Sequence, residues 1–128
     1  MIQNLLYPEL AKTVIDAFYE VCKALPSGML EEVYQRALVV ELKQQGKNVE
    51  EQKPLTVTYK GTDVGFYRPD MIVDGKIILE LKAVESLTKA NSAQLINYLA
   101  ITGLEIGYLL NFGEHRRFVR LANPNLLR

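Results

Sequence analysis

The chain has 128 residues, of which 48% are hydrophobic, and its 15 basic and 15 acidic side chains give a formal net charge of zero. This composition excludes a disordered chain and supplies enough apolar residues for the core of one domain. Nucleic-acid-binding proteins are usually basic overall, so the balanced charge argues against a large electrostatic footprint, although a small basic site remains compatible with it.

The cellular setting follows from three features of the sequence. The single cysteine, Cys22, cannot form an internal disulfide, which fits a reducing compartment. The start of the chain has neither the basic region nor the apolar run of a signal peptide. No apolar stretch approaches membrane-spanning length. We therefore expect a soluble cytoplasmic protein without a membrane partner, folded as a single domain over residues 1–128.

Two helices are predicted at the start of the chain. Apolar residues recur at helical spacing from Pro8 to Leu25, and the Pro-Ser-Gly sequence at 26–28 ends this helix. The second helix is predicted from Met29 to Gln45, with Gly28 as a cap and Gly46 after its end.

Three strands are predicted next. Leu55 to Tyr59 alternates between apolar and polar residues, and Val64 to Val73 follows after a turn. Pro69 lies inside the second strand, which is therefore expected to be irregular there. The Asp-Gly sequence at 74–75 indicates a hairpin that leads into the third strand, Lys76 to Ala83.

The remaining elements are one helix and two strands. Thr88 can cap a helix that runs to about Thr102, with Gly103 after its end. Two further strands are predicted over Glu105 to Asn111 and Arg117 to Leu121. The predicted order is ααβββαββ, an α/β or α+β domain with a mixed β-sheet flanked by helices.

Charged residues occur inside the most strand-like segment of the chain. Because side chains alternate along a strand, Glu80 and Lys82 share one face of the third predicted strand with Ile78. The opposite face carries only apolar residues and is predicted to be core. Since unpaired charge in a core strand is costly, the presence of Glu80 and Lys82 favours a functional site.

The face on which Asp70 lies depends on the length of the hairpin loop. A strict two-residue loop would pair Asp70 with Leu79 and place its carboxylate on the face opposite to Glu80. A three-residue loop with Gly75 in the left-handed region would pair Asp70 with Ile78, diagonal to Glu80 on the same face. The second arrangement suits the sequence well because glycine adopts positive φ without strain.

Two carboxylates on one face of a sheet repel each other unless a cation compensates. Mg²⁺ prefers hard oxygen ligands and often binds one or two carboxylates together with water and a substrate phosphate, which Asp70 and Glu80 could provide. Lys82 could then orient a water molecule or offset phosphate charge, as phosphodiester hydrolysis requires. The alternative is a structural ion pair of Asp70 with Arg68 or Lys82.

A third carboxylate belongs to the second predicted helix. Glu31 lies at the edge of the apolar flank of that helix, whereas Glu32 points away from it. Glu31 can therefore approach the core and a neighbouring site. The alternative is a glutamate of the first turn that satisfies the helix N-terminus, and the local sequence fits both interpretations.

Several short motifs, taken in order, resemble one protein family. Gly28, Glu31 and Tyr34 form a G-x-x-E-x-x-Y pattern, which is followed by YRPD, ELKAVE, AQLINYL and GYLLNFG. This order, from about Val14 to Val119, resembles the GxxExxY protein family, which looks like a compact branch of the PD-(D/E)XK, restriction-endonuclease-like superfamily.

The resemblance implies a nuclease core of order αβββαβ that uses Mg²⁺ or Mn²⁺. It implies that Asp70 and Glu80 are metal ligands and that Lys82 is the catalytic lysine. Glu31 matches the acidic position of the first helix, and it would bind the metal directly or through water.

The resemblance also implies contacts with substrate. Gln94 and Tyr98 match the Q-x-x-x-Y motif that lines the site of RecB-like nucleases, and their spacing places both on one helix face. The alternative is that Tyr98 is partly buried core and Gln94 a surface residue. Further candidates for contact with substrate, on weaker grounds, are Arg68, Tyr34, Lys53 and Lys89.

The chain departs from the family pattern before the motif glutamate. Family members often have H-x-E-L-G-P-G there, whereas this chain has CKALPSG, so Cys22 replaces a common histidine. We expect Cys22 to be a small packed residue. His115, the only histidine, is expected to be a solvated turn residue.

The sequence predicts a Mg²⁺- or Mn²⁺-dependent nuclease that hydrolyses phosphodiester bonds of nucleic acid, with DNA favoured over RNA. The alternative is a catalytically silent module that retains the fold and binds nucleic acid or protein. Zero net charge favours this alternative and equally fits a nuclease that needs a homodimer or a protein partner to hold DNA. A purely structural domain whose charges form ion pairs is a third alternative.

Overall fold

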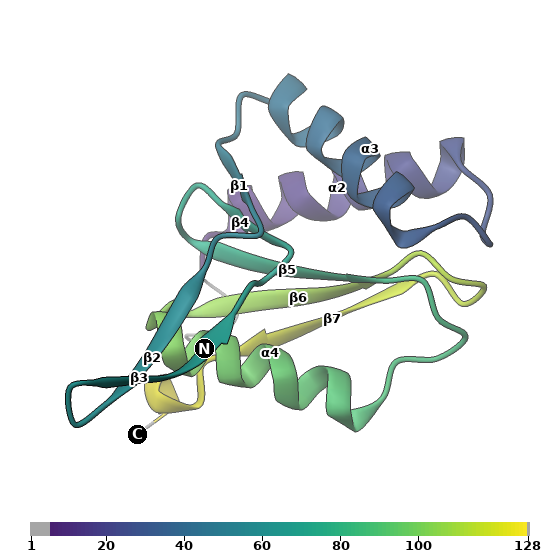
Figure 1. Ribbon diagram of the computed structural model, residues 1–128. Helices are drawn as coiled ribbons and strands as arrows, with labels where there is room; N and C mark the ends of the chain where they lie inside the picture. Colours follow the sequence, from purple (N-terminus) through teal and green to yellow (C-terminus); the bar gives the residue numbers. More distant parts are fainter. Residues whose placement is uncertain (1–5, 128) are drawn as a thin grey trace.

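The computed structural model describes residues 6–127, which form a five-stranded sheet with helices on both faces and a separate two-stranded hairpin (Figure 1). The elements are α2 (Pro8–Ala24), α3 (Glu31–Gln44), β1 (Val49–Glu51), β2 (Leu55–Tyr59), β3 (Thr62–Tyr67), β4 (Met71–Val73), β5 (Ile77–Lys82), α4 (Lys89–Thr102), β6 (Ile106–Asn111), β7 (Arg117–Ala122) and the 3₁₀ helix η1 (Pro124–Leu127). No helix within the described range is long and apolar enough to cross a membrane. The start of the chain, on which the expectation of no signal peptide rests, lies partly outside the described residues.

The five-stranded sheet has the order β1-β4-β5-β6-β7, in which β5 and β6 are parallel and the other neighbours are antiparallel. Helices α2 and α3 cover one face, and α4, which connects the parallel pair, covers the other (Figure 1). The predicted mixed sheet flanked by helices is therefore confirmed. The predicted order ααβββαββ lacks two of the observed strands, because β1 was not predicted and the second predicted strand is divided.

Strand β5 is buried on both faces because a hydrophobic core lies on each side of the sheet. Ile77, Leu79 and Leu81 pack with α2 and α3 in the larger core. Ile78 packs in a second core with residues of α4, among them Leu95. A central strand that is covered on both faces is typically a nearly continuous apolar run, and the exceptions in β5 are the buried Glu80 and the partly buried Lys82 at its end.

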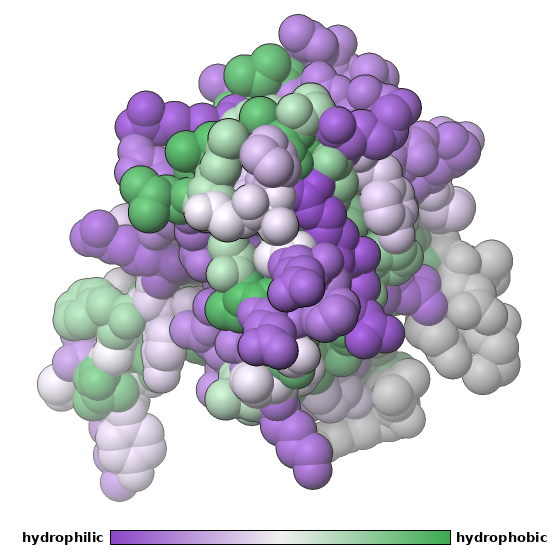
Figure 2. Space-filling model, turned by 90° about the vertical axis from the view of Figure 1, so that its right-hand side faces the viewer, coloured by the Kyte–Doolittle hydropathy of each residue, from purple (hydrophilic) through white to green (hydrophobic). Residues whose placement is uncertain are grey.

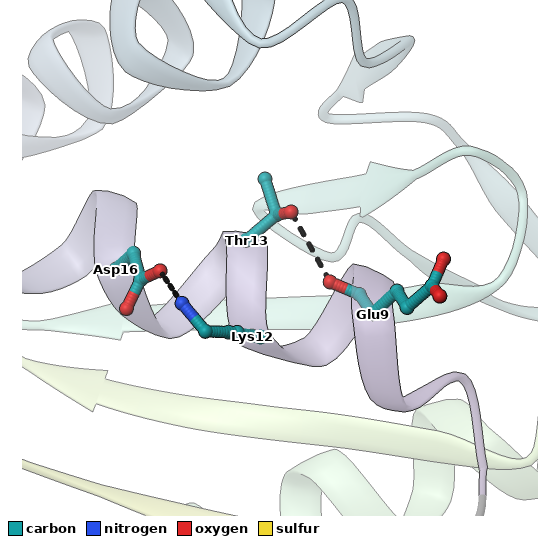
Figure 3. A network of polar contacts seen from close by, with 4 residues as sticks. All are labelled: Glu9, Lys12, Thr13 and Asp16. Carbon is teal, nitrogen blue, oxygen red and sulfur yellow. Dashed lines mark hydrogen bonds and ion pairs between the residues drawn. The ribbon is translucent and has the colours of Figure 1, made fainter.

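Helix α2 shows how burial rather than surface bonding fixes an element. On its exposed side, the Lys12 ammonium pairs with Asp16 at 2.6 Å and the Thr13 hydroxyl donates to the Glu9 carbonyl at 3.1 Å (Figure 3). Exposed pairs at this spacing contribute only about 0.2–0.5 kcal/mol each. The buried stripe therefore determines the packing of the helix, and it consists of Leu10, Val14, Ala17, Phe18 and Val21.

The termini of the helices agree with the sequence at most positions. Helix α4 has Thr88 as its N-cap, which accepts from the Asn91 backbone N–H, and Gly103 follows it in the left-handed region, as predicted. The second helix begins two residues later than expected. Its N-cap is Leu30, and Gly28 lies in the preceding loop with φ of 97°.

The predicted strand Val64 to Val73 is in fact two strands in two different sheets. β3 pairs with β2 in the hairpin, and β4 pairs with β1 and β5. The interruption at 68–70 includes Pro69, which has no N–H to donate to a strand ladder. Pro69 indicated an irregularity at this point, but no pattern in the sequence indicated that the chain changes sheet there.

The connection between β4 and β5 decides which face Asp70 occupies. Ile72 pairs with Ile78, so a three-residue connection, 74–76, joins the strands, and Gly75 has φ of 64°. The predicted loop length and common face are thus observed. The predicted pairing of Asp70 with Ile78 is wrong, because the observed register carries Asp70 opposite Glu80. Since the register differs from the prediction by two positions, the face is preserved.

The segment that follows Lys82 is fixed to the turn between β6 and β7. The Asn111 side chain accepts from the Val84 and Gly113 backbone N–H groups at 3.1 and 2.9 Å, and it donates to the Val84 carbonyl at 2.9 Å. Phe112 N donates to the Lys82 carbonyl at 2.8 Å. The end of β5 is therefore held in place by a buried amide and a close backbone approach.

We predict that Gly113→Ala destabilises the protein by about 2 kcal/mol, because overpacking of this kind typically costs 1–3 kcal/mol. A Cβ on Gly113 would lie 2.0 Å from the Val84 carbonyl oxygen, which is backbone and cannot move aside. Chemical denaturation measures the change. Gly65→Ala is the matched control, since a Cβ there meets only ordinary contacts at 3.7 Å or more. Equal effects of the two changes would contradict the prediction.

Candidate functional site

Asp70 and Glu80 face each other just before β4 begins, beside a part of β5 that extends past the end of β4. The Asp70 backbone N–H donates to Glu80 Oε1 at 2.8 Å, and the Leu81 backbone N–H donates to Asp70 Oδ2 at 2.7 Å. The Asp70 carboxylate thus takes the position of a strand partner for Leu81. Each carboxylate is oriented by a backbone group of the other residue's segment, so the two side chains are fixed relative to each other.

Gln52 supports Asp70 from the other side. Its backbone N–H donates to the Asp70 carbonyl at 3.2 Å, and its side-chain amide donates to Asp70 Oδ1 at 3.3 Å. Gln52 follows the short strand β1, which no periodic pattern in the sequence indicates. The sequence therefore gave no signal that could have assigned this residue to the site.

Glu31 and Lys82 lie beside the carboxylate pair. Glu31 is the first residue of α3, and its side chain accepts a hydrogen bond from the Ala83 backbone. Lys82, at the end of β5, lies close enough to lower the pKa of Glu31, Asp70 and Glu80. Glu31 and Lys82 therefore lie in the neighbourhood of Asp70 and Glu80, and the catalytic roles of the four residues stay predictions.

Burial and mutual repulsion govern the charge of these carboxylates. Glu80 is only 4% exposed, and burial followed by the negative charge of Asp70 raises its pKa to about 8. Burial also raises the pKa of Asp70, against the hydrogen bond from Leu81. Much of the Glu31 side chain is exposed, yet loss of water around the carboxylate and the charge of Asp70 raise its pKa.

The arrangement can be compared with the needs of a metal ion. Within residues 6–127, no three or more His, Cys, Asp or Glu side chains are grouped so that they could hold a metal ion together. The three predicted ligands are thus not preassembled as a set. Asp70 and Glu80 as a pair provide hard oxygen donors whose repulsion a cation would relieve, which fits an ion bound through two carboxylates and water.

Tyr98 and Gln94 approach the carboxylate pair from α4. The Gln94 amide donates to the Tyr98 hydroxyl at 3.1 Å. Burial, followed by the charges of Glu80 and Asp70, raises the pKa of Tyr98 to about 12, so its hydroxyl keeps its proton at neutral pH. The Tyr67 ring meets the Tyr98 ring edge to face at 5.8 Å between centroids. Tyr67, in the YRPD motif, was not predicted as a site residue.

Tyr34 lies in the core and not at a solvent-reachable position. It is fully buried, its ring stacks on Phe112 at 4.9 Å between centroids, and its hydroxyl donates to the Pro26 carbonyl and accepts from the Met29 N–H. These contacts tie the loop before α3 to the core. They favour a structural role for Tyr34 over the predicted contact with substrate.

The remaining basic candidates lie on the surface. Arg68 is exposed two residues before Asp70, and Lys89 is exposed at the start of α4. Lys53 pairs with Glu50 at 3.3 Å. In the described part of the chain, Asp70 forms no ion pair with Arg68 or Lys82, so the predicted structural pair is absent there.

A pocket of about 440 Å³ opens beside the carboxylates and provides access from solvent. Its lining includes both Glu31 and Asp70 and is completed by Glu32, Gln35, Arg36, Glu51 and Gln52. The pocket is mainly acidic, because its one basic residue pairs with Glu32. Such a lining attracts cations more readily than phosphate groups.

Cys22 and His115, for which no part in the site was expected, have positions that match their expected roles. Cys22 is partly buried against the larger core, and burial raises the pKa of its thiol. The Arg116 guanidinium donates to the Cys22 carbonyl. His115 is exposed in the turn between β6 and β7. Figure 2 shows the molecule from the side at which this turn lies, with hydrophilic residues over much of the surface and smaller apolar areas between them.

Comparison with known proteins identifies a family and two similar solved structures. Residues 8–121 match the family model of the PD-(D/E)XK nuclease superfamily. Among solved structures, the one described as the crystal structure of SSO0001 has 21% sequence identity and a TM-score of 0.53, covering 73% of this chain and 50% of that chain. An alkaline exonuclease, LHK-Exo, from Laribacter hongkongensis has 16% identity and a TM-score of 0.52, covering 75% of this chain and 57% of that chain.

These likenesses to solved structures concern the fold, and this chain spans about half the length of each of the two proteins. No curated protein matches the chain.

The pKa of Glu80 predicts how stability depends on pH. A carboxyl group whose pKa is raised in the folded state binds its proton more tightly there, so stability is lost as pH rises from the ordinary value of 4.5 through about 8. We expect the metal-free protein, measured with chelator present, to be less stable at pH 8 than at pH 5. Glu80→Gln should flatten this dependence.

Thermal unfolding across this pH range is the measurement. Glu32→Gln is the control, because Glu32 is an exposed neighbour of the site that pairs with Arg36. A pH dependence that persists unchanged in Glu80→Gln would show that other groups titrate in this range.

Proposed function

Because the chain belongs to the PD-(D/E)XK nuclease superfamily, we propose that it hydrolyses phosphodiester bonds of nucleic acid with a divalent metal ion. The observation that carries this proposal is the fixed opposition of Asp70 and Glu80, with Lys82 next along the same strand face. DNA is the proposed substrate in preference to RNA. Membership of the GxxExxY branch, a cytoplasmic location, a single domain over residues 1–128 and a homodimer or protein partner stay predictions.

Nucleases of this superfamily generally use divalent metal ions, and Asp70 and Glu80 are the residues that would hold one here. A bound Mg²⁺ or Mn²⁺ would supply Lewis-acid polarisation of the phosphate and lower the pKa of bound water. Glu31 is proposed to act through water, since it is not grouped with the other two carboxylates as a preassembled site. Its hydrogen bond to the Ala83 backbone keeps its side chain beside Lys82.

Lys82 is proposed to stabilise negative charge on the phosphate as the bond to the leaving oxygen breaks. Its ammonium is the basic group that acts on all three carboxylates, and Asn111 and Phe112 hold the backbone around it. A charge fixed in advance lowers the barrier more than one that must be reoriented during the reaction.

Tyr98 and Gln94 are proposed to contact the substrate at the opposite side of the carboxylate pair. Because the pKa of Tyr98 is raised to about 12, its hydroxyl remains a hydrogen-bond donor at neutral pH. Arg68 is proposed to contact phosphate, since it is exposed immediately before Pro69 and Asp70.

A second candidate is the catalytically silent binding module that retains the fold. The backbone hydrogen bonds to both Asp70 and Glu80 favour it, because they give the two carboxylates a structural function without a metal. The two candidates differ in whether the protein binds a divalent ion and in what Lys82 does.

We predict that millimolar Mn²⁺ stabilises the wild-type protein, because an ion that binds only the folded state stabilises it by about 2.7 kcal/mol at 100 times its Kd. Asp70→Asn should lose this stabilisation, since it removes one ligand charge, whereas Glu32→Gln should keep it. Thermal unfolding with and without Mn²⁺ measures both. If Asp70→Asn gains as much as wild type, the ion binds elsewhere.

We predict that Lys82→Ala lowers the rate of cleavage by about 100-fold or more, since removal of one preorganised stabilising group typically has this effect. Affinity for nucleic acid should change little. A residue that merely contacts phosphate would instead weaken binding and reduce the salt slope by about one unit. Lys12→Ala, which removes an exposed lysine of α2 away from the candidate site, is the control.

Loss of folding stability by about 3–5 kcal/mol in Lys82→Ala, without a separate loss of catalysis, would indicate a structural ion pair instead. Cleavage, affinity across salt concentrations and unfolding are therefore measured on the same variant. Absence of cleavage by the wild type with every divalent metal tested would favour the binding module.

A further inference from the structure

The β2–β3 hairpin projects from the body of the protein and carries exposed aromatic side chains (Figure 1). Tyr59 is 62% exposed, Phe66 69% and Tyr67 38%. The hairpin forms its own two-stranded sheet and is not hydrogen-bonded into the main sheet. Several large aromatic side chains exposed on one projecting element usually mark an interaction site, because their exposure to water does not contribute to folding stability.

Alternation along the strands sorts these residues onto two faces. Leu55, Val57 and Tyr59 share one face of β2. Leu55 pairs with Tyr67 and Val57 with Gly65, so these partners lie on the same face. Beyond Val57 the register shifts by one residue because β3 has a bulge, so Tyr59 is assigned to this face from the alternation along β2. We call it the tyrosine face, and its side chains are Leu55, Val57, Tyr59 and Tyr67. Phe66 pairs with Thr56 and therefore lies on the opposite face.

The tyrosine face runs from the tip of the hairpin to the carboxylates. Tyr59 lies near the tip, and Tyr67 lies at the base, where its ring meets that of Tyr98 at 5.8 Å. The charges of Glu80 and Asp70 act on Tyr98, so the base of the face is next to the candidate site. Between the tyrosines, Gly65 has no side chain to interrupt the surface.

The hairpin itself carries one basic and one acidic side chain, Lys60 and Asp63, so it is neutral. Two further basic residues flank its base, namely Lys53, which pairs with Glu50, and the exposed Arg68. The Lys60 ammonium lies over the Tyr59 ring at 5.4 Å from its centroid. Exposed aromatic rings among basic side chains are the combination with which proteins bind single strands, because rings stack on bases while cations neutralise phosphates.

We infer that the tyrosine face of the β2–β3 hairpin binds unpaired bases of a nucleic-acid strand and directs that strand to Asp70 and Glu80. The part of the inference that directs the strand to Asp70 and Glu80 rests on the proposed function. The part that concerns base binding rests on the hairpin itself. Bases of a duplex have their faces covered by their neighbours, so stacking on Tyr59 and Tyr67 requires unpaired ones.

The absence of tryptophan from the sequence allows a direct test of the two faces. Tyr59→Trp and Phe66→Trp each introduce a single tryptophan, on the tyrosine face and on the opposite face respectively. Each variant is titrated with a short single-stranded oligothymidylate and with a duplex of equal length, with chelator present so that no cleavage occurs. We expect the single strand to quench the fluorescence at position 59 and to leave that at position 66 unchanged.

Affinity measurements give a second readout on the same face. Tyr59→Ala should weaken binding of the single strand by about tenfold or more, since loss of one base–aromatic stack has this size. Tyr59→Phe keeps the ring and should bind as the wild type does, and so should Phe66→Ala. Both positions are exposed, and unfolding curves confirm that each variant is folded.

The inference is overturned if neither tryptophan responds, if the one at position 66 responds equally or more, or if duplex quenches position 59 as strongly as the single strand. It is also overturned if sedimentation shows that Tyr59→Ala abolishes self-association and leaves oligonucleotide affinity intact. Failure of the proposed function looks different: the single strand then binds the tyrosine face, but no divalent metal supports cleavage. Cleavage without a response at position 59 rejects this inference alone.

Discussion

The hydrogen bond from the Leu81 backbone N–H to the Asp70 carboxylate determines much of the architecture around the site. Strand β4 begins only at Met71, after the chain has left the hairpin, so β5 would otherwise lack a partner beside Leu81 on that side. A buried backbone N–H without a partner is costly, and Asp70 supplies the missing acceptor. In return the Asp70 N–H bonds Glu80, so that a discontinuity in the sheet becomes the support of two carboxylates.

The same arrangement places two carboxyl groups where negative charge is disfavoured. Burial and the neighbouring carboxylate raise the pKa of Glu80 to about 8, while only single backbone hydrogen bonds and Lys82 act in the opposite direction. Without a cation, the negative charge of the ionised carboxylates is poorly compensated. A divalent ion that also binds substrate phosphate would compensate it. The burial of two carboxylates close together thus accounts both for the cost in stability and for the proposed binding of a metal ion.

The layers of the fold bring the other groups to this point. Glu31 comes from α3 on one face of the sheet, and Tyr98 comes from α4 on the other. Strand β5 lies between these layers and extends beyond β4, so both helices can approach its end. The hairpin leaves from the same discontinuity, and for that reason its base, at Tyr67, contacts Tyr98.

Local patterns in the sequence are enough to predict the helices, most strands and the common face of Glu80 and Lys82, because these depend on residue periodicity and on local turn chemistry, such as the positive φ of Gly75. The sequence alone could not determine that β3 and β4 belong to different sheets, since Pro69 indicates an interruption but not which partner each strand takes. Nor could it determine that Tyr34 is buried, or that Gln52 and Asn111 hold the site. Those outcomes depend on contacts between residues far apart in the chain, and only the tertiary structure brings such residues together.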